Sequence, residues 1–413
     1  MRFFNICFIM DNQATDKLFT SGYILACIGN FLLFFGFYIL MPVLPLYLIE
    51  TFELSKSMVG ITLACYTLAA LFIRPFTAFF ADLFDRKPLY LMAYFFFIAV
   101  FISYPLVATV GLFLLMRILH GLAFGAVTTT GSTLIVDIMP ASRRGEGLGY
   151  FGMANNLAMA IGPMIGLFIL DAQLGFNMIF YVAILSGGLG FCSVSFIKVP
   201  KKQPKESRHE PLSLDRFFLL KGMRAGACVF FLAIPYGIMT TYVALYGKEV
   251  GITNGMGIFF SLMSAGLIIS RMFAGKLVDR GKLANVIFVG SMISACTFFL
   301  FSFMPEISRL NYNLLLVAFY FVALFIGVGY GMMFPAYNTL FVNLAPHNRR
   351  ATANSTYFTS WDIGIGVGLV FGGYIAEHIG HSETYLFGAF FALLASFIFK
   401  KWTVPHFNKN KLV

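Results

Sequence analysis

Long apolar runs constrain this chain more than any other feature of its sequence. About twelve such runs are each long enough to cross the hydrocarbon core of a membrane, which takes roughly 20 residues. Helices satisfy the backbone hydrogen bonds inside such a run, so they are the form expected to span lipid. The predicted spans are residues 19–47, 58–78, 88–107, 111–138, 147–170, 177–197, 222–247, 254–278, 284–304, 311–342, 351–376 and 384–401.

The composition agrees with this interpretation. Hydrophobic residues make up 59% of the 413 residues and charged residues 11%. The mean hydropathy is +0.83. These values exclude a water-soluble globular protein. We therefore predict an all-α integral membrane protein with twelve transmembrane helices.

The basic side chains are distributed unevenly along the chain, whose formal net charge is +11. With both termini in the cytoplasm, three of the 29 lysines and arginines (Lys56, Lys248 and Arg309) are predicted on the outer side, and only Arg117 well inside the membrane. This excess of positive charge on the inner side orients membrane proteins, so it reports topology and not a nucleic-acid partner. We expect a multi-pass protein of the bacterial cytoplasmic (inner) membrane, in contact with lipid.

No sequence pattern indicates enzymatic chemistry or metal binding. The six cysteines show no paired spacing and are predicted to be small apolar residues: Cys7, Cys27, Cys65, Cys192, Cys228 and Cys296. Metal-ligand clusters, nucleophile triads and phosphate-binding glycine loops do not occur at useful spacing. We expect no enzyme, no metal and no cofactor. No cleavable signal peptide is expected, and Met10 is an alternative initiator to Met1.

The chain contains an internal repeat. An arginine precedes an aspartate by eight positions twice, at an offset of 197, as Arg74 to Asp82 and Arg271 to Asp279. A second set recurs at an offset of 206: Gly121 and Gly125 correspond to Gly327 and Gly331, Pro140 to Pro346, Arg143 and Arg144 to Arg349 and Arg350, and Gly162 and Gly166 to Gly368 and Gly372. We predict two parallel six-helix bundles at residues 19–197 and 222–401. Residues 1–18, 198–221 and 402–413 are expected to be a cytoplasmic tail, a linker and a second tail.

Several motifs carry a resemblance to a known family. The loop Ala78–Lys87 is similar to the G-x-x-x-D-R-x-G-R-K motif of the major facilitator superfamily, LLMRILHGLAFGA resembles its span-4 motif, and AMAIGPMIG resembles the span-5 motif of its drug/proton antiporters. The resemblance covers essentially the whole chain and is closest to twelve-span multidrug and sugar exporters. It implies the major facilitator fold, a small-molecule substrate, alternating access, a proton gradient as the energy source and a monomer.

The first loop departs from the family motif. Ala78 stands where glycine is usual, Leu83 where arginine follows the aspartate, and Asp85 where a second glycine is usual. The second copy is better kept, with Gly275, Asp279, Arg280 and Gly281 in place. Because Leu83 removes the usual arginine partner of Asp137, Arg86 or Arg143 would have to replace it.

Three polar residues are candidates for proton coupling. Asp362 is the acidic residue predicted deepest in a span, where carboxylates usually face an interior cavity and mark a substrate or proton path. The alternative is a structural partner for a buried hydroxyl or arginine. The resemblance implies a proton-transfer role for Arg117, which could instead tie helix backbones together or bind an anionic group of the substrate. His120, within i,i+3 reach of Arg117, is a candidate relay or a neutral neighbour of that cation.

Gly162, Pro163 and Gly166 lack side-chain chemistry, so their predicted role is geometric. Proline kinks the span, and glycines let a neighbouring helix approach closely. The resemblance makes this motif typical of exporters, and plain small-residue packing is the alternative.

Two larger sets complete the candidate residues. Charged residues at the inner ends of spans are predicted to pair across the two halves as a gate, or else to be surface charges that satisfy topology: Asp82, Arg86, Asp137, Arg143, Arg144, Asp279, Arg280, Arg349 and Arg350. Polar and aromatic residues within spans are predicted to line the substrate cavity: Asn30, Tyr38, Tyr236, Tyr242, Asn338, Tyr357 and Trp361.

The resulting functional hypothesis is a secondary active transporter that exports a small amphipathic drug, metabolite or sugar-like solute by proton antiport. A proton symporter or facilitator that imports a small metabolite is the alternative, against which Gly162 and Pro163 argue.

Overall fold

The computed structural model describes residues 17–140, 143–199, 218–252, 254–346 and 350–412. In these ranges it contains twelve helices long and apolar enough to cross a membrane, which confirms the predicted number. They are α2 (Ser21–Tyr38), α4 (Lys56–Leu83), α5 (Arg86–Ser103), α6 (Val110–Ile138), α7 (Arg144–Asp171), α8 (Gly175–Ser195), α10 (Met223–Glu249), α11 (Met256–Asp279), α12 (Leu283–Phe301), α14 (Tyr312–Leu344), α15 (Arg350–His378) and α16 (His381–Ile398). Shorter helices are α3 (Leu44–Phe52), α13 (Met304–Leu310) and α17 (Val404–Asn410).

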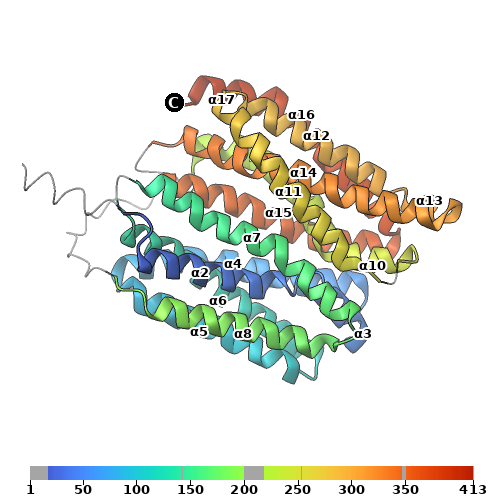
Figure 1. Ribbon diagram of the computed structural model, residues 1–413, viewed down its shortest axis with the longest axis horizontal. Coiled ribbons are helices and arrows are strands. Elements are labelled where there is room, and N and C mark those ends of the chain that lie inside the picture. Colours follow the sequence, from blue (N-terminus) through green and yellow to red (C-terminus); the bar gives the residue numbers. More distant parts are fainter. Residues whose placement is uncertain (1–16, 141–142, 200–217, 253, 347–349, 413) are drawn as a thin grey trace, which may run out of the picture.

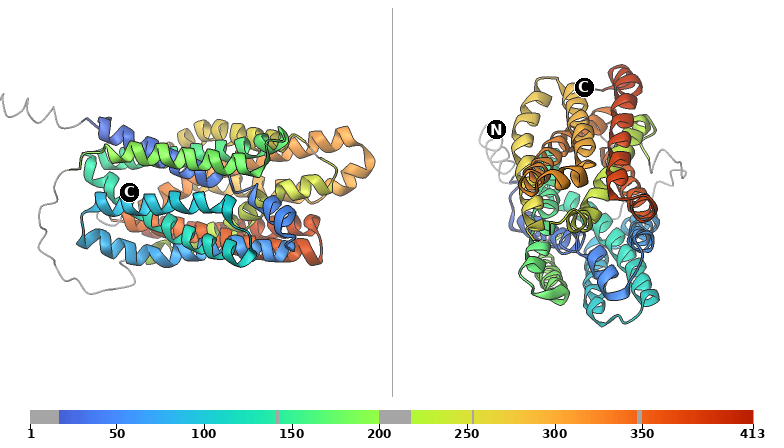
Figure 2. Two further views of the ribbon diagram at one scale, coloured as in Figure 1. Left: turned by 90° about the horizontal axis from the view of Figure 1, so that it is seen from below. Right: turned by 90° about the vertical axis from the view of Figure 1, so that its right-hand side faces the viewer.

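The long helices form two bundles that lie side by side (Figures 1 and 2). In the first bundle α2 packs against α7 and α8, α4 against α6, and α5 against α6 and α8. In the second bundle α10 packs against α15 and α16, α11 against α14, and α12 against α14 and α16. Each contact in one bundle thus has its counterpart six spans later, which agrees with the predicted tandem repeat.

Repeated glycines explain why equivalent helices meet at equivalent points. A side chain on Gly121 of α6 would overlap the backbone oxygen of Tyr66 in α4, and one on Gly327 of α14 would overlap that of Met263 in α11. Tyr66 and Met263 are themselves separated by the offset of 197. Close approach of backbones at small residues is a general way for membrane helices to associate.

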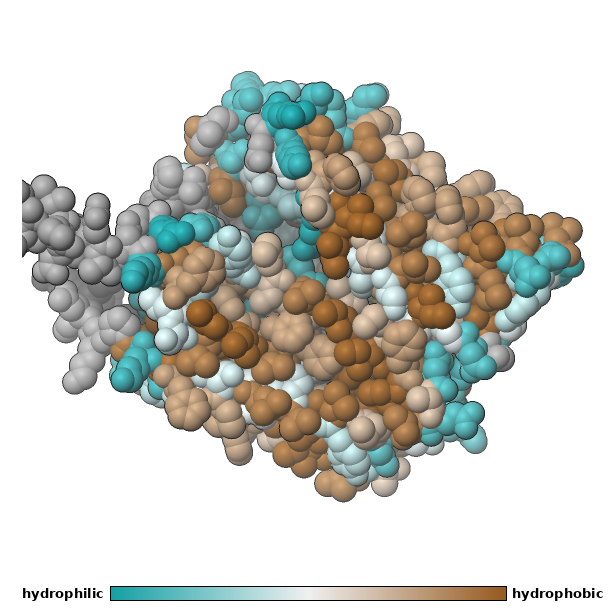
Figure 3. Space-filling view, in the orientation of Figure 1, coloured by the Kyte–Doolittle hydropathy of each residue, from teal (hydrophilic) through white to brown (hydrophobic). Residues whose placement is uncertain are grey.

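The two bundles meet along α4 with α15 and along α7 with α11, and α3 also touches α10. We call the end of the molecule at which the described chain begins and finishes the proximal end, and the opposite end, which carries α3 and α13, the distal end (Figure 1). Hydrophobic side chains cover the middle of the face shown in Figure 3, whereas hydrophilic ones gather toward its ends and upper edge. That distribution suits a protein surrounded by lipid.

The structure differs from two predicted boundaries. The first predicted span breaks after Tyr38, passes through turns at 39–43 and resumes as α3, because Pro42 and Pro45 interrupt regular helix there. The predicted tail at 402–413 is largely helical, since α16 continues through a π turn (Phe399–Thr403) into α17. The Leu412 N–H donates to the Asn343 carbonyl oxygen at 2.9 Å, which attaches this segment to α14.

The glycine contacts predict a position-dependent effect of alanine. Gly121→Ala and Gly327→Ala should each destabilise the protein by about 1–3 kcal/mol, because the added methyl forces two backbones apart. Gly149→Ala in α7 is the matched control, since nothing lies within 4 Å of its added methyl group. Thermal unfolding in detergent checks this, and equal melting temperatures for the three variants would contradict the packing argument.

Candidate functional site

An ion pair between two membrane-spanning helices joins the two bundles. The Arg74 Nη1 atom of α4 lies 2.7 Å from the Asp362 Oδ2 atom of α15. The two side chains are 22% and 25% exposed, so the pair is mostly enclosed. Asp362 was expected either to mark a substrate or proton path or to be the partner of a buried hydroxyl or arginine. The structure provides an arginine partner, and this arginine belongs to the opposite bundle.

Arg74 and Arg271 correct the predicted charge distribution. Both were counted with the inner-side charges at the ends of the predicted spans 58–78 and 254–278, but Arg74 lies within α4 and Arg271 within α11, about nine and eight residues before the ends of those helices. With Arg117 they place three arginines inside spans. The repeat was the signal that could have found them, because both arginines lie two helical turns before the loop aspartate and so belong to the helix.

Three tyrosines lie in the neighbourhood of Asp362. The phenols of Tyr38, Tyr66 and Tyr357 lie within electrostatic range of its carboxylate. Tyr38 and Tyr66 belong to the first bundle, and Tyr357 is five residues before Asp362 on α15. Both bundles therefore contribute phenols to this region.

Arg117 and His120 form a separate cluster inside the first bundle. Arg117 is 5% exposed, its guanidinium carbon lies 4.3 Å from the centre of the Tyr66 ring, and its Nη1 atom donates to the Tyr104 hydroxyl at 3.3 Å. The Arg117 Nε atom is buried without a hydrogen-bond partner. His120 is fully buried, with its Nδ1 atom 2.7 Å from the Tyr104 hydroxyl.

The surroundings of His120 bear on its predicted relay role. The rings of Phe97 and Phe101 lie 4.6 and 4.5 Å from its imidazole, centre to centre. A proton on His120 would place a second positive charge beside Arg117 in this apolar site, which is unfavourable. Arg117 itself borders a small hollow at the boundary between the bundles, to which Thr241 and Leu369 of the second bundle contribute.

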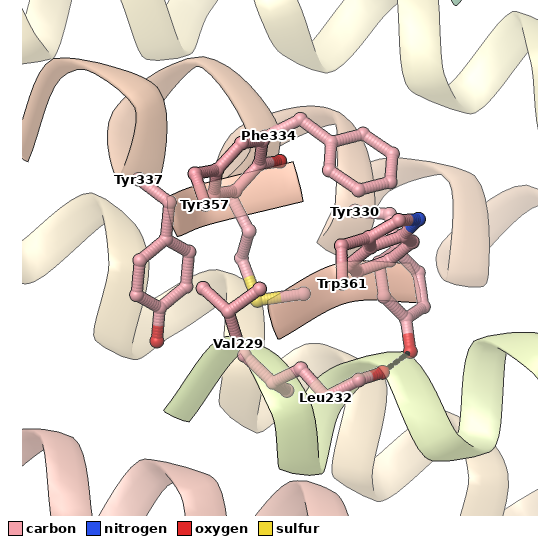
Figure 4. Close-up of a pocket in the computed structure, with 8 residues that line it drawn as sticks. Val229, Leu232, Tyr330, Phe334, Tyr337, Tyr357 and Trp361 are labelled. Atoms are coloured by element: carbon pink, nitrogen blue, oxygen red, sulfur yellow. Dashed lines mark hydrogen bonds between the residues drawn. The ribbon is translucent and has the colours of Figure 1, made fainter. Parts of the chain in front are cut away.

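An aromatic pocket lies in the second bundle (Figure 4). Tyr330, Phe334, Tyr357 and Trp361 line it, and the Phe334 and Trp361 rings are 4.8 Å apart between centres. Tyr236 packs on Trp361 at 5.0 Å from the adjacent helix α10. Three predicted cavity residues, Tyr236, Tyr357 and Trp361, are thus brought together.

Other predicted cavity residues lie elsewhere. Asn30 donates from Nδ2 to the Phe151 carbonyl oxygen at 3.0 Å, and the Tyr242 hydroxyl donates to the Leu369 carbonyl oxygen at 2.8 Å. Both side chains therefore connect helices within one bundle. Asn338 is half-buried in α14, and Tyr38 lies near Asp362 as described above.

The Gly162-Pro163 motif contacts the break in the first span. A side chain on Gly162 would meet the backbone of Tyr38 and Ile39, and one on Gly166 would overlap the Ile39 carbonyl oxygen. Pro163 lies inside α7, and the Ser264 hydroxyl of α11 donates to the nearby Ala160 carbonyl oxygen at 2.7 Å. The motif thus lies where α7 contacts both the irregular part of its own bundle and the opposite bundle.

Three of the predicted gate residues form ion pairs at the proximal end. Arg86 Nη1 lies 2.5 Å from Asp137 Oδ1, so Arg86 replaces the arginine missing at Leu83. Arg143 pairs with Glu146 at 2.8 Å, and Arg280 caps the end of α11. Both ion pairs lie within the first bundle and not across the halves. Arg349 and the side chains of Asp82, Arg144, Asp279 and Arg350 lie outside the described residues.

The distal end carries polar contacts that sequence reasoning did not identify. Lys56 of α4 lies 3.6 Å from a Glu249 oxygen and donates to the Ala376 carbonyl oxygen at 3.2 Å, and Glu249 also accepts from buried His381. Further links between the bundles are Lys248 to Glu50 at 2.8 Å, the Ser57 N–H to Glu377 at 2.8 Å and the Gly255 N–H to Asp171 at 3.1 Å. These contacts close the distal end.

The Arg74–Asp362 pair predicts non-additive stability changes. Arg74→Gln or Asp362→Asn alone leaves one charge enclosed without its partner, which is more destabilising than removing both. The double variant should recover part of the loss, with a coupling of about 0.5–3 kcal/mol. Thermal unfolding of the three variants measures this, and strictly additive effects would show that the pair contributes nothing.

Comparison with known proteins agrees with this architecture. The family model described as Major Facilitator Superfamily matches residues 26–369 and 312–412. An uncharacterised MFS-type transporter of Methanocaldococcus jannaschii is 26% identical over 381 residues, covering 90% of this chain and 95% of the relative. The quinolone resistance protein NorA of Staphylococcus aureus (strain MRSA252) is 29% identical over 244 residues, 56% of this chain and 62% of NorA.

Two solved structures share the fold. An auto-inhibited peptide transporter of the POT family has a TM-score of 0.76 at 12% identity and covers 95% of this chain and 98% of its own. A D-xylose–proton symporter has a TM-score of 0.73 at 15% identity, with 94% and 98% covered. The match of the family model along the chain, together with the two repeated six-helix bundles, shows that this protein belongs to the major facilitator superfamily.

Proposed function

We propose that this transporter exports a small amphipathic molecule by proton antiport with alternating access, with the proximal end in the cytoplasm. The Arg74–Asp362 ion pair carries the proposal, because it joins the two bundles through a group that can gain a proton. The lysine and arginine distribution supports the orientation.

The ion pair supplies a physical link between protonation and movement. While Asp362 is ionised, its attraction to Arg74 holds α4 against α15. A proton on Asp362 removes that attraction and leaves the arginine without a counter-charge in a mostly enclosed site, which is unfavourable. Protonation therefore favours separation of the bundles at this point. Arg117 and His120 are secondary candidates for the proton path through Tyr66, which lies near both Arg117 and Asp362.

The contacts between the bundles at the distal end have to open and close during the transport cycle. The interactions of Lys56 with Glu249, of Lys248 with Glu50 and of Ser57 with Glu377 hold the bundles together at that end. They have to break before a substrate can leave on the distal side. In our proposal, the proximal charged residues then take over as the closed gate.

Two observations favour export. The packing of Gly162 and Gly166 against the break in the first span supports a geometric role for this exporter-like motif. The similarity to the quinolone resistance protein NorA supports a drug-like substrate.

Import by proton symport is the second candidate, and the charge balance in the middle of the spans favours it. Arg74, Arg117 and Arg271 lie there with Asp362 as the acidic residue described among them. Two positive charges are left over, and they attract an anion. Binding of an anion and protonation of Asp362 favour each other, so the anion and the proton would be transported in the same direction.

Transport in inverted membrane vesicles with an imposed pH gradient tests the proposal. The parent protein should accumulate a fluorescent dye in a gradient-dependent manner, and Asp362→Asn should abolish that accumulation because the residue can no longer exchange a proton. Glu53→Gln, an exposed acid-to-amide change at the end of α3, is the control and should leave accumulation unchanged.

Two outcomes contradict the proposal in different ways. Dye movement that is independent of the gradient and unaffected by Asp362→Asn would remove the coupling role of Asp362. Gradient-driven uptake only in right-side-out vesicles would retain coupling and reverse the direction.

A further inference from the structure

We propose that Arg271, together with the phenols of Tyr236 and Tyr357, binds the anionic group of an apolar organic anion, whose ring occupies the aromatic pocket beside Trp361. The inference rests on the proposed transport function, because it names the chemical class of the substrate, but it does not depend on the direction of transport.

Arg271 lacks the counter-charge that its repeat equivalent possesses. Arg74 is paired with Asp362, whereas no ion pair of Arg271 exists among the described residues. The Nε and Nη2 atoms of Arg271 are buried without hydrogen-bond partners. Asp279, whose side chain is not described, is eight residues further along the same helix, about 12 Å by the rise of an α-helix. The Arg271 guanidinium therefore has donors available for a ligand.

Packing alone does not account for this arginine. Its guanidinium carbon lies 6.0 Å from the centre of the Phe334 ring, at the outer limit of a cation–π contact. A buried charge usually requires a partner, because desolvation of an ion is strongly unfavourable. A substrate that carries an anionic group would supply the missing counter-charge of Arg271 when it binds.

The phenols next to Arg271 add hydrogen-bond donors. Tyr236 and Tyr357 lie within electrostatic range of the guanidinium. Tyr236 is 2% exposed, and its hydroxyl has no hydrogen-bond partner. Arginine N–H groups and phenol O–H groups donate, and a carboxylate accepts at both oxygens. The three residues therefore match an anionic acceptor, and charge-assisted hydrogen bonds of this kind are the strong ones.

The adjoining pocket selects the rest of the ligand. Figure 4 shows the rings of Tyr330, Phe334 and Trp361 grouped on one side of the pocket, Tyr337 and Tyr357 on the other, and Val229 and Leu232 below them. The Tyr330 hydroxyl is already used, since it donates to the Leu232 carbonyl oxygen at 2.8 Å. The lining of the pocket is thus apolar and aromatic. With Arg271 next to Phe334, this lining matches the chemistry of one aromatic ring that bears a carboxylate.

The binding test uses the full-length protein in detergent and the tryptophan in the pocket. The chain has two tryptophans, and Trp402 is 60% exposed, so Trp402→Phe leaves Trp361 as the reporter. The probe is 4-bromobenzoate, whose bromine quenches tryptophan fluorescence on contact, and its neutral isostere 4-bromobenzamide is the comparison. We expect saturable quenching by the carboxylate and little by the amide at equal concentration.

Variants then assign the effect to Arg271. Arg271→Gln should weaken the apparent affinity for 4-bromobenzoate by about ten- to a hundredfold, the range expected for loss of a hydrogen bond to a charged group. Arg271→Lys should retain part of the affinity. The matched control Lys276→Gln removes an exposed positive charge from the same helix and should have no effect.

Equal quenching by the carboxylate and the amide in Trp402→Phe, which retains Arg271 and both phenols, would overturn the inference. Undiminished carboxylate selectivity in Arg271→Gln would overturn the role of Arg271. Asp362-dependent transport of a dye without carboxylate-selective binding would reject the anion subsite and retain the proposed function. Carboxylate-selective binding without proton-coupled transport would retain the anion subsite and contradict the proposed function.

Discussion

Hydrocarbon cannot solvate a charge, so the helices have to pack in a way that shields the charged side chains within the spans from lipid. Arg74 and Asp362 meet between the two bundles, where each provides the other's counter-charge at 2.7 Å. The same requirement places Arg117 under the Tyr66 ring and Arg271 near Phe334. Because the central pair spans the boundary between the bundles, the electrostatics of one carboxylate and the relative position of the bundles are physically connected.

The repeat provides a symmetrical framework and an asymmetrical centre. Gly121 and Gly327 bring equivalent helices into contact, so both bundles share one packing pattern. The chemistry differs at equivalent positions, since Arg117 corresponds to Ala323 and Asn156 to Asp362 at the offset of 206. Backbone packing thus maintains the shape of each half, while single side chains make the two halves chemically distinct.

The two ends of the molecule also differ in how they are held. Lys56, Glu249 and His381 form a network between the bundles at the distal end. At the proximal end, Arg86 and Asp137 stabilise the first bundle internally. Among the described residues, the ion pairs named here thus connect the two bundles at the distal end and stabilise the first bundle at the proximal end.

The sequence by itself determined the twelve spans, the tandem repeat, the close approach at the repeated glycines and the depth of Asp362. These properties depend on local hydropathy and periodicity, which can be read along the chain. It also indicated Arg86 or Arg143 as the partner of Asp137, because Leu83 stands where the family motif has an arginine.

Only the tertiary structure decided which groups meet. The partner of Asp362 is 288 positions away at Arg74, in the other bundle. The unbalanced charge at Arg271 and its aromatic pocket arise from α10, α11, α14 and α15 together. Contacts between distant helices depend on how the bundles pack, and no periodicity along one segment contains that information.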